Sequence, residues 1–328
     1  MPSRTKPGKQ SPLPTFIPPE LATLTDKAPA GDDWIHEVKL DGYRTAARLE
    51  TGKVRMLTRS GLDWTARFRP IAAALAVPTI RAAYLDGEIA VLGEDGVTSF
   101  AALQDALSRG QTQRLSYHVF DPLHLDGGDL TGLPLIERKA VLARLIARLP
   151  PGGPVRYSDH VQGQGPKFFA QACKLHLEGI VSKRAAAPYL SRRSEDWLKV
   201  KCLNRQEFVI GGWMESDKRG RSLRSLLLGY YDGGKLIFAG KAGTGFDLKT
   251  GHDLVAWLRK LERPEPPFVA VPRAYQRGAR WAEPKLVVEV AFTTWTADHL
   301  LRHPSFEGLR EDKPARQVKL ERPKTKGS

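Results

Sequence analysis

The sequence predicts an α+β domain followed by a smaller domain that is mostly β-structure, and three observations carry this prediction. The chain has 328 residues, which is long enough for two domains. Residues 34–201 alternate short β-rich stretches with amphipathic helical ones, a mixture typical of α+β domains. After about Leu203 the pattern changes to β-rich stretches with a single helical stretch among them. We therefore expect a domain boundary near that residue.

The chain is expected to have four segments. Residues 1–32 are rich in Pro, Lys and small residues, and we expect an extended N-terminal arm that packs on the first domain. The first domain is expected over 33–203 and the second over 204–319. Residues 320–328 form a basic tail.

In the first domain, turn-separated β-rich stretches alternate with helical ones. The clearest helix lies within 135–149, where apolar residues recur at helical spacing: Ile136, Val141, Leu142, Leu145 and Ile146. The expected strands are 34–40, 43–49, 54–58, 83–92, 115–125, 179–182 and 197–201. The other expected helices are 68–76, 99–108 and 167–177.

In the second domain, the patterns fit a small β-barrel of the OB type, with a small sandwich as the alternative. The expected strands are 208–213, 226–231, 235–241 and 286–293, and the expected helix is 251–261. We expect the tryptophans of this domain to fill its core or rim: Trp213, Trp257, Trp281 and Trp295.

The formal net charge of +15 favours a polyanionic partner. DNA, RNA and anionic lipid all fit that charge, but no basic amphipathic helix stands out, so nucleic acid is favoured. No apolar run is long enough to span a membrane, and residues 1–30 lack the apolar region of a signal peptide. We expect a cytoplasmic protein with no membrane partner.

Two pairs of residues have spacings typical of metal or redox sites, but we expect neither pair to form one. Cys173 and Cys202 are not in a CxxC pair, and we expect two reduced structural thiols. His299 and His303 are four residues apart on a possible short helix, a spacing that metal ligands also use. With no neighbouring Glu or Cys in a familiar pattern, we expect surface or packing histidines.

The stretch from Glu37 to Arg44 reads as a strand, an Asp-Gly turn and a second strand, with Glu37 and Lys39 on one face. By itself it could equally be an ordinary exposed hairpin. A nucleotidyl-transfer site, however, needs a lysine that can attack a phosphate, carboxylates that hold a divalent metal, arginines for the phosphates and an aromatic ring for the base.

Seven motifs in the chain supply these groups in order. Each is weak alone, but seven in collinear order are specific. They are Lys39-Leu40-Asp41-Gly42-Tyr43-Arg44 (KxDGxR), Arg59-Ser60-Gly61, Asp86-Gly87-Glu88, Tyr117–Asp121 with Phe120, Glu178-Gly179-Ile180-Val181-Ser182-Lys183 (EGxVxK), Trp197-Leu198-Lys199-Val200-Lys201 (WLKxK) and Arg310-Glu311-Asp312-Lys313 (RxDK).

The set resembles the ATP-dependent DNA ligases over about Trp34 to Lys319. It looks closest to the ligase module of bacterial non-homologous end-joining ligases, which share the ending RHPSFxGLREDK found here at 302–313. The resemblance implies an adenylation domain followed by an OB-fold domain. One departure is Arg192, which stands where family members often have Gly before the WLKxK strand.

The resemblance also implies roles for individual residues. Lys39 would be the nucleophile that takes AMP from ATP, and Glu37 would contact the adenine amino group. The implied catalytic residues are Lys39, Arg310, Asp312 and Lys313. The implied nucleotide-binding residues are Glu37, Arg44, Arg59, Glu88, Phe120, Val181, Lys199 and Lys201. Glu88 and Glu178 would hold Mg²⁺ or Mn²⁺. The implied DNA contacts are Arg59, Arg193, Lys218, Arg219 and Arg221.

The implied reaction has three steps and a hinge near Leu203–Glu207. AMP passes from ATP to Lys39, then to the 5′-phosphate of a break, and leaves when the 3′-hydroxyl attacks. Lys199 and Lys201 are expected to lower the pKa of Lys39 by like-charge repulsion. Implied partners are nicked or broken double-stranded DNA and a Ku-like end-binding protein, with the protein a monomer associated with the bacterial nucleoid.

Two other functions remain as alternatives. An RNA ligase or an mRNA-capping guanylyltransferase would use the same lysine chemistry, although the WLKVK and RHPSFxGLREDK forms favour DNA ligases. A non-catalytic OB-fold nucleic-acid-binding protein would not need the intact set of residues from Lys39 to Lys313.

Overall fold

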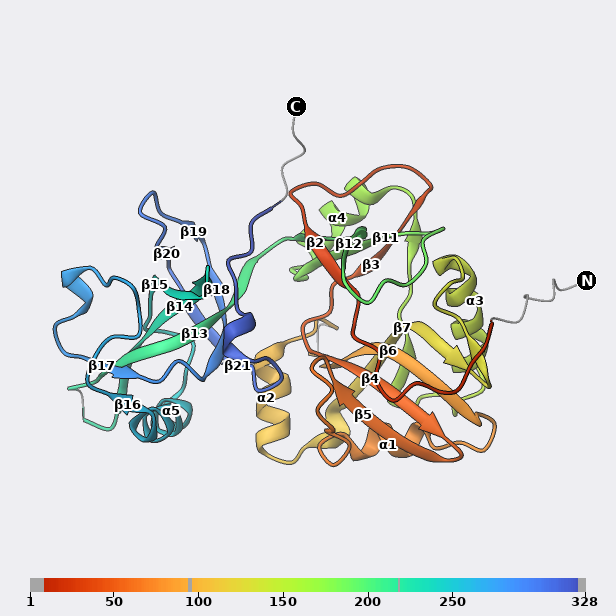
Figure 1. Ribbon diagram of the computed structural model, residues 1–328, viewed down its shortest axis with the longest axis horizontal. Coiled ribbons are helices and arrows are strands. Elements are labelled where there is room, and N and C mark those ends of the chain that lie inside the picture. The colour runs from red at the N-terminus through yellow and green to blue at the C-terminus, as the bar shows by residue number, and fades with distance from the viewer. Residues whose placement is uncertain (1–8, 94–95, 218, 324–328) are drawn as a thin grey trace, which may run out of the picture. The chain divides into compact units, whose positions relative to one another are not determined.

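The computed structural model describes residues 9–93, 96–217 and 219–323. The chain divides into two compact units (Figure 1), the first ending at Cys202 and the second comprising Leu203–Arg322. None of the helices in the described residues is long and apolar enough to cross a membrane.

The first unit contains a large sheet with the strand order β1-β8-β7-β6-β4-β5, and β9 pairs parallel to β7. One face of this sheet packs on three helices and forms a hydrophobic core with them. The strands are β1 Lys9–Gln10, β4 Tyr43–Glu50, β5 Lys53–Thr58, β6 Ala82–Val91, β7 Leu115–Leu125, β8 Gly128–Asp129 and β9 Val155–Tyr157. The helices are α1 Arg69–Leu75, α2 Phe100–Ser108 and α3 Leu135–Ile146.

A second sheet in the same unit has the order β10-β3-β11-β12-β2. Helix α4 contributes Ala172 to a small core with Ile180 and Val200 of this sheet. The strands are β2 Leu21–Leu24, β3 Trp34–Val38, β10 Val161–Gln162, β11 Gly179–Arg184 and β12 Arg193–Lys201, and α4 is Gly165–Lys174.

The other face of the large sheet meets the second sheet. A separate apolar cluster joins Tyr84 and Phe120 of the large sheet to Trp197 of β12. The rings of Phe120 and Trp197 meet edge to face with centroids 5.9 Å apart. The side chains on this face alternate with those in the helical core, as the pleat of a strand requires.

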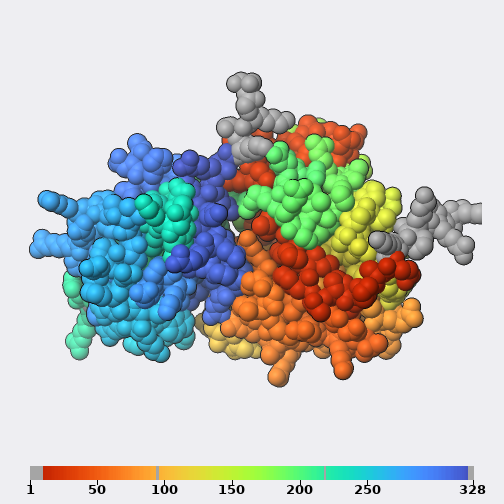
Figure 2. All heavy atoms as spheres, viewed as in Figure 1, coloured from red at the N-terminus to blue at the C-terminus, as the bar shows by residue number. Residues whose placement is uncertain are grey.

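The N-terminal segment lies on the first unit, and Figure 2 shows it in red along the surface of that unit. Strand β2 pairs parallel to β12. The backbone N–H of Ile17 donates to the Tyr84 hydroxyl at 3.0 Å. Glu20 is fully buried and accepts a hydrogen bond from the backbone N–H of Leu190 at 2.7 Å. These contacts fix the segment to both sheets.

The second unit is built on a sheet with the order β15-β14-β13-β17-β16, and β18 pairs with both β13 and β21. Helix α5 is capped by Asp247, whose side chain accepts from the N–H of Thr250. The strands are β13 Asn204–Glu215, β14 Leu223–Asp232, β15 Lys235–Ala242, β16 Glu262–Arg263, β17 Ala279–Ala282, β18 Val287–Phe292, β19 Thr294–Trp295, β20 Leu301–Arg302 and β21 Ser305–Leu309, and α5 is Leu248–Lys260.

Three of the four tryptophans of this unit pack as expected. Trp213 is fully buried, and Trp281 and Trp295 pack against the core. Trp257 is 41% exposed on α5, because it lies off the stripe that Leu254 and Leu258 bury. The expectation for Trp257 was therefore wrong.

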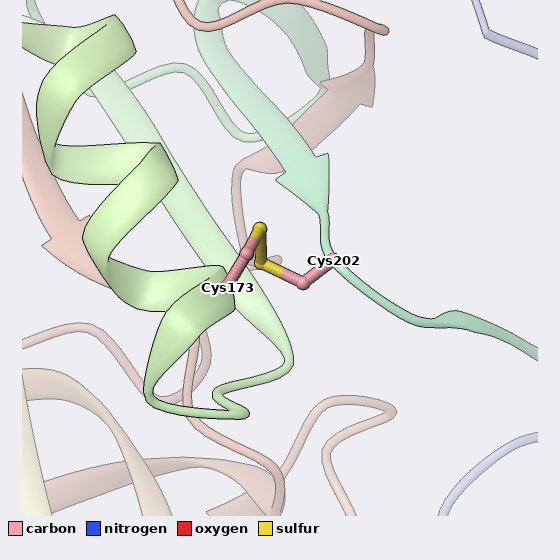
Figure 3. The surroundings of a disulfide bond; sticks show 2 residues. All are labelled: Cys173 and Cys202. Carbon is pink, nitrogen blue, oxygen red and sulfur yellow. A yellow bond between two sulfur atoms is a disulfide. The ribbon is translucent and has the colours of Figure 1, made fainter.

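The expectation of reduced thiols was also wrong, because Cys173 and Cys202 form a disulfide (Figure 3). Cys173 lies in the last turn of α4, and Cys202 directly follows β12. Packing of α4 on the sheet brings their Cα atoms to 5.2 Å although 29 residues separate them. Sequence spacing alone does not reveal such a pair.

The short helix expected around His299 and His303 is absent from the described structure. Both residues have positive φ values, 56° and 51°, and lie in the loops beside the β19–β20 pair. Isolated residues with positive φ are incompatible with a continuous right-handed helix.

Strands β17 and β21 were not expected from the sequence.

Candidate active site

Lys39 directly follows β3 and its backbone N–H donates to the carbonyl of Gly179 at 2.9 Å. Its Nζ lies 2.6 Å from Oε2 of Glu178. Burial by itself would lower the pKa of Lys39, but Glu178, together with Glu88 and Asp41, raises it above its usual value. The expectation that Lys199 and Lys201 lower this pKa is not met, because the nearby carboxylates raise it.

The turn after Lys39 is tied to the large sheet and to α2. Oδ2 of Asp41 accepts from the backbone N–H of Phe100, the first residue of α2, at 3.0 Å. A Cβ at Gly42 would lie 2.1 Å from the carbonyl oxygen of Ile89. The Asp-Gly pair therefore lets the chain pass close to β6 and holds Lys39 on a rigid support.

Arg44 on β4 forms a bidentate ion pair with Asp86 on β6, at 2.8 and 2.6 Å. The Tyr189 hydroxyl donates to the same carboxylate at 2.7 Å. The Arg44 guanidinium lies over the ring of Phe120, 4.8 Å from its centroid. Arg44 is thus fixed on the face that carries Phe120, and Asp86 fixes it, a role that the sequence analysis did not assign.

Glu37 on β3 is buried and bound by two lysines. Its Oε1 accepts from Nζ of Lys139 at 2.6 Å, and its Oε2 accepts from Nζ of Lys183 at 2.8 Å. The Ser158 hydroxyl donates to Oε2 at 3.3 Å. Burial raises the pKa of Glu37, but Lys139 and Lys183 outweigh burial and hold this pKa below its usual value.

Sequence analysis missed Lys139 and Ser158, because neither lies in one of the seven motifs. One signal was available for Lys139. It falls on the buried stripe of α3 with Leu135, Arg138 and Leu142, at positions i, i+3, i+4 and i+7. Ile136 was one of the apolar residues expected on the buried face of this helix, but its side chain is exposed.

Phe120 lies on β7 of the large sheet, and Val181 lies on β11 of the second sheet. Phe120 is 8% exposed, and Nζ of Lys183 lies 4.2 Å from its ring centroid. Val181 pairs with Glu37 on one side and with Lys199 on the other. Lys201 pairs with Gly179, which lies two positions before Val181 on β11. Glu37, Val181, Lys199 and Lys201 are therefore carried on the adjacent strands β3, β11 and β12, whereas Phe120 belongs to the other sheet.

Arg59, in the turn after β5, lines a small cavity. Arg44 and Asp86 of the large sheet line the same cavity, as do Phe16, Ile17 and Pro19 of the N-terminal segment. The sequence analysis did not place the N-terminal segment next to Arg59.

A divalent metal fits the carboxylates around Lys39 only if phosphate oxygens complete its ligands. Glu178 and Glu88 both raise the pKa of Lys39, so both carboxylates lie within electrostatic range of its amine. The described residues contain no group of three or more His, Cys, Asp or Glu side chains that could hold a metal. Mg²⁺ commonly binds through one or two carboxylates together with substrate phosphates, so this donor set fits it.

The second unit holds its expected catalytic residues in an acidic cluster that we call the Arg310 cluster, made of Arg310, Asp312, Lys313, Glu207 and Glu289. Arg310 forms a bidentate pair with Asp312, with both distances 3.0 Å. Its guanidinium lies 3.8 Å from Glu207 and 3.5 Å from Glu289. Lys313 forms an ion pair with Glu207. Burial would lower the pKa of Arg310, but the three carboxylates raise it.

Glu207 and Glu289 were missed by the sequence analysis because neither lies in a motif. They are direct cross-strand partners on β13 and β18. Like charges in that position destabilise a sheet unless cations bridge them, and Arg310 and Lys313 supply the cations.

Two of the five expected DNA contacts, Arg193 and Arg221, are engaged in local bonds. Arg193 donates to the carbonyl of Ala22 in β2. Arg221 donates to the carbonyls of Leu223 at 3.1 Å and Gly243 at 3.2 Å. Arg219 is exposed in the loop before β14, and Lys218 lies outside the described residues.

Comparison with known proteins agrees with this arrangement. The family model described as "ATP dependent DNA ligase domain" matches residues 19–201, and "ATP dependent DNA ligase C terminal region" matches residues 219–313. The chain is 41% identical over 324 residues to the multifunctional non-homologous end joining protein LigD of Pseudomonas aeruginosa. That match covers 98% of this chain but only 38% of the relative.

This chain is also similar to solved structures of DNA ligases. A structure titled "mycobacterial DNA ligase D complexed with ATP and MES" matches with a TM-score of 0.69 and 35% identity, covering 92% of this chain and 97% of the other. The ligase domain of Mycobacterium tuberculosis LigD matches with a TM-score of 0.53 and 36% identity, covering 93% and 98%. The expected fold class, an adenylation domain followed by an OB-fold domain, is confirmed. The chain belongs to the family of ATP-dependent DNA ligases.

Proposed function

We propose that this chain seals breaks between a 5′-phosphate and a 3′-hydroxyl in double-stranded DNA, using ATP. The observation that carries the proposal is the gathering of Glu37, Lys39, Phe120 and Glu178 in one site of the first unit, although 141 positions separate the first from the last. This site combines a lysine nucleophile, carboxylates and an aromatic ring, which together suit adenylyl transfer.

In the first step Nζ of Lys39 attacks the α-phosphorus of ATP. A P–N bond forms, the bond to the bridging oxygen of the β-phosphate breaks, pyrophosphate leaves and the amine loses a proton. The carboxylates of Glu178 and Glu88 would leave Lys39 and hold Mg²⁺ or Mn²⁺, which supplies charge neutralisation on the phosphates when bound.

The remaining residues of the pocket position the nucleotide. Phe120 and Val181 enclose the base, and Glu37 accepts a hydrogen bond from it. Arg44, Lys199 and Lys201 bind the ribose and the α-phosphate, where cations stabilise the charge of the transition state. Arg59 binds the nucleotide phosphate or the 5′-phosphate of the break.

Arg310, Asp312 and Lys313 orient the leaving pyrophosphate in the first step. In the second step an oxygen of the DNA 5′-phosphate attacks the phosphorus of the lysyl-AMP and releases Lys39. In the third step the 3′-hydroxyl attacks the DNA 5′-phosphorus, the phosphodiester forms and AMP leaves. Arg193, Lys218, Arg219 and Arg221 would contact DNA phosphates, and the net charge of +15 supports such a partner.

We further propose that the breaks arise in end joining and that a Ku-like protein recruits this chain, which acts as a monomer. The support is the similarity to relatives named as non-homologous end joining proteins. The chain spans less than two fifths of the length of the first such relative.

Labelled nucleotides test the proposal. The protein is incubated with α-labelled ATP or GTP and a divalent metal, and then with nicked, cohesive or blunt DNA. Labelled protein formed from ATP, followed by sealed nicked DNA, is the expected result. Label from GTP alone would favour capping chemistry, sealing of RNA alone would favour an RNA ligase, and no label from either nucleotide would contradict the proposal.

A further inference from the structure

Helix α3 buries two consecutive cations, Arg138 and Lys139, that lie outside all seven motifs. A buried charge is costly unless an opposite charge matches it. Arg138 forms a bidentate pair with Asp121, at 2.7 and 2.8 Å, and Asp121 directly follows Phe120. Lys139 pairs with Glu37. Both cations of this helix therefore fix an element of the proposed base pocket.

The position of Lys139 is fully determined by its contacts. Besides Glu37 at 2.6 Å, its Nζ donates to the carbonyl of Ser158 at 2.6 Å. It also lies 4.4 Å from the ring centroid of Tyr157. An ammonium group has three N–H donors. The carboxylate of Glu37, the carbonyl of Ser158 and the ring of Tyr157 account for all three.

The contacts of Glu37 leave one acceptor site open within the described residues. Oε2 accepts twice, from Lys183 and Ser158, whereas Oε1 accepts only from Lys139. Each carboxylate oxygen has two lone pairs, so one lone pair of Oε1 remains. Lys183 contacts both Oε2 of Glu37 and the ring of Phe120, so the Glu37 carboxylate lies near the ring expected to stack on the base.

An ionised carboxylate can accept hydrogen bonds but cannot donate them. It therefore suits the 6-amino group of adenine, which donates, and repels the 6-oxo group of guanine or hypoxanthine, which accepts. We propose that Lys139 is a positioning residue that sets the base preference of the enzyme, because it holds Glu37 ionised and turns the open lone pair of Oε1 towards a 6-aminopurine. This inference rests on the proposed function and assigns the specificity of its base pocket to a residue of α3.

Lys183 alone cannot replace Lys139 in this role. Lys183 binds the other oxygen, Oε2, and without Lys139 the carboxylate is free to rotate and share both oxygens with Lys183. The lowered pKa of Glu37 is consistent with this arrangement, since both lysines contribute to it.

The test compares ATP with two analogues in single-turnover self-adenylylation of the full chain. Purine riboside 5′-triphosphate lacks the 6-amino group, and inosine triphosphate has an oxygen in its place. The variants are Lys139→Met, which keeps the apolar stem, and Ser158→Ala, which removes one weak donor to Oε2. Arg148→Met is the control, because Arg148 is an exposed cation just beyond the same helix.

The unmodified enzyme should prefer ATP over purine riboside triphosphate by about tenfold or more in KM, as expected for a hydrogen bond to a charged group. Lys139→Met should reduce this preference to within about twofold through a higher KM for ATP, with little change in kcat. Arg148→Met should keep the full preference. Full preference in Lys139→Met, or none in the unmodified enzyme, would overturn the inference.

Two features keep the test decisive. If Lys139→Met fails to fold, Ser158→Ala provides the second variant, and it should lower the preference for ATP by about two- to threefold. An unchanged preference in Ser158→Ala would then overturn the inference. Self-adenylylation without base preference contradicts this inference alone, whereas no self-adenylylation with any nucleotide contradicts the proposed function as well.

Discussion

The base pocket of the first unit and the Arg310 cluster of the second unit both bury charge, but they balance it in opposite ways. In the base pocket two ammonium groups, Lys139 and Lys183, share the single carboxylate of Glu37. In the Arg310 cluster two cations meet three carboxylates: Arg310, Lys313, Glu207, Glu289 and Asp312. Among these residues, cations outnumber carboxylates in the pocket, and carboxylates outnumber cations in the cluster.

This difference indicates two kinds of catalytic group. The pocket keeps its carboxylate as a fixed acceptor before any nucleotide arrives, so it is preorganised for a neutral base. The cations of the cluster already have acidic partners, so a pyrophosphate must compete with Glu207 and Glu289 for them. We infer that the first unit selects the nucleotide and that the second acts on the leaving group.

Lys39 should show the largest effect, because we propose it as the nucleophile of the covalent step. Lys39→Ala should reduce self-adenylylation by at least about a thousandfold, since no other nucleophile replaces the amine. The measurement is single-turnover transfer of label from ATP to protein. Lys39→Arg is the matched control that keeps a positive charge beside Glu178, and it should be equally inactive; activity in either variant would separate Lys39 from the chemistry.

Glu207→Gln breaks the charge balance of the Arg310 cluster. It leaves Lys313 without its partly buried carboxylate partner, and we expect the second unit to lose about 3 kcal/mol of stability. Hydrogen exchange in increasing denaturant, read on peptides of each unit, should show the loss only within Leu203–Arg322. Glu265→Gln is the control, because Glu265 is exposed in the same unit. Equal loss in both variants would remove the special role of Glu207.

The disulfide gives the first unit a covalent constraint. Cys173→Ser should lower the stability of this unit by about 2–3 kcal/mol, because the unfolded chain gains freedom over a 29-residue separation. Peptides of α4 and β12 should exchange faster, while those of the second unit stay unchanged. Addition of a reductant to the unmodified protein is the matched experiment, and an unchanged exchange rate under reduction would show that this bond does not hold α4 in place.

Acidification should weaken the first unit by a smaller amount through His118 on β7. Burial, followed by the charge of Arg156, lowers the pKa of His118 to about 4. The unfolded chain takes up this proton near pH 6.5, so stability falls as pH falls from about 6.5 towards 4. Between pH 7 and pH 5 the half-buried imidazole should account for about 1–2 kcal/mol. Denaturant unfolding of His118→Asn at both pH values should show a smaller loss; an equal loss would assign the effect to other groups.

Much of the fold could be predicted from the sequence because its signals are local. The expected strand 115–125 coincides with β7, since its β-rich run is long and bounded by turn residues. Helix α2 begins one residue after the expected start, because Ser99 caps it. Short strands such as β17 were missed, because four residues give too little pattern to detect.

The site could be predicted only where a motif named its residues. The motifs named Lys39, Glu178 and Phe120, and in the structure Lys39 contacts Glu178. Lys139 and Glu207 were not expected, because they act through partners that are 102 and 106 positions away in the chain. The roles of these two residues depend on the opposite charges that the fold brings beside them. The local sequence pattern does not encode these pairings. The Cys173–Cys202 bond was missed because its two cysteines are also far apart in the chain.

The division of labour between the two units is tested most directly by Arg310→Ala in two separate reactions. One reaction is self-adenylylation with labelled ATP, and the other is sealing of a nick that already carries AMP on its 5′-phosphate. We predict that self-adenylylation falls by about a hundredfold or more, while sealing of the pre-adenylylated nick stays within a few-fold of the unmodified enzyme. An equal loss in both reactions would contradict the assignment of the Arg310 cluster to the leaving pyrophosphate.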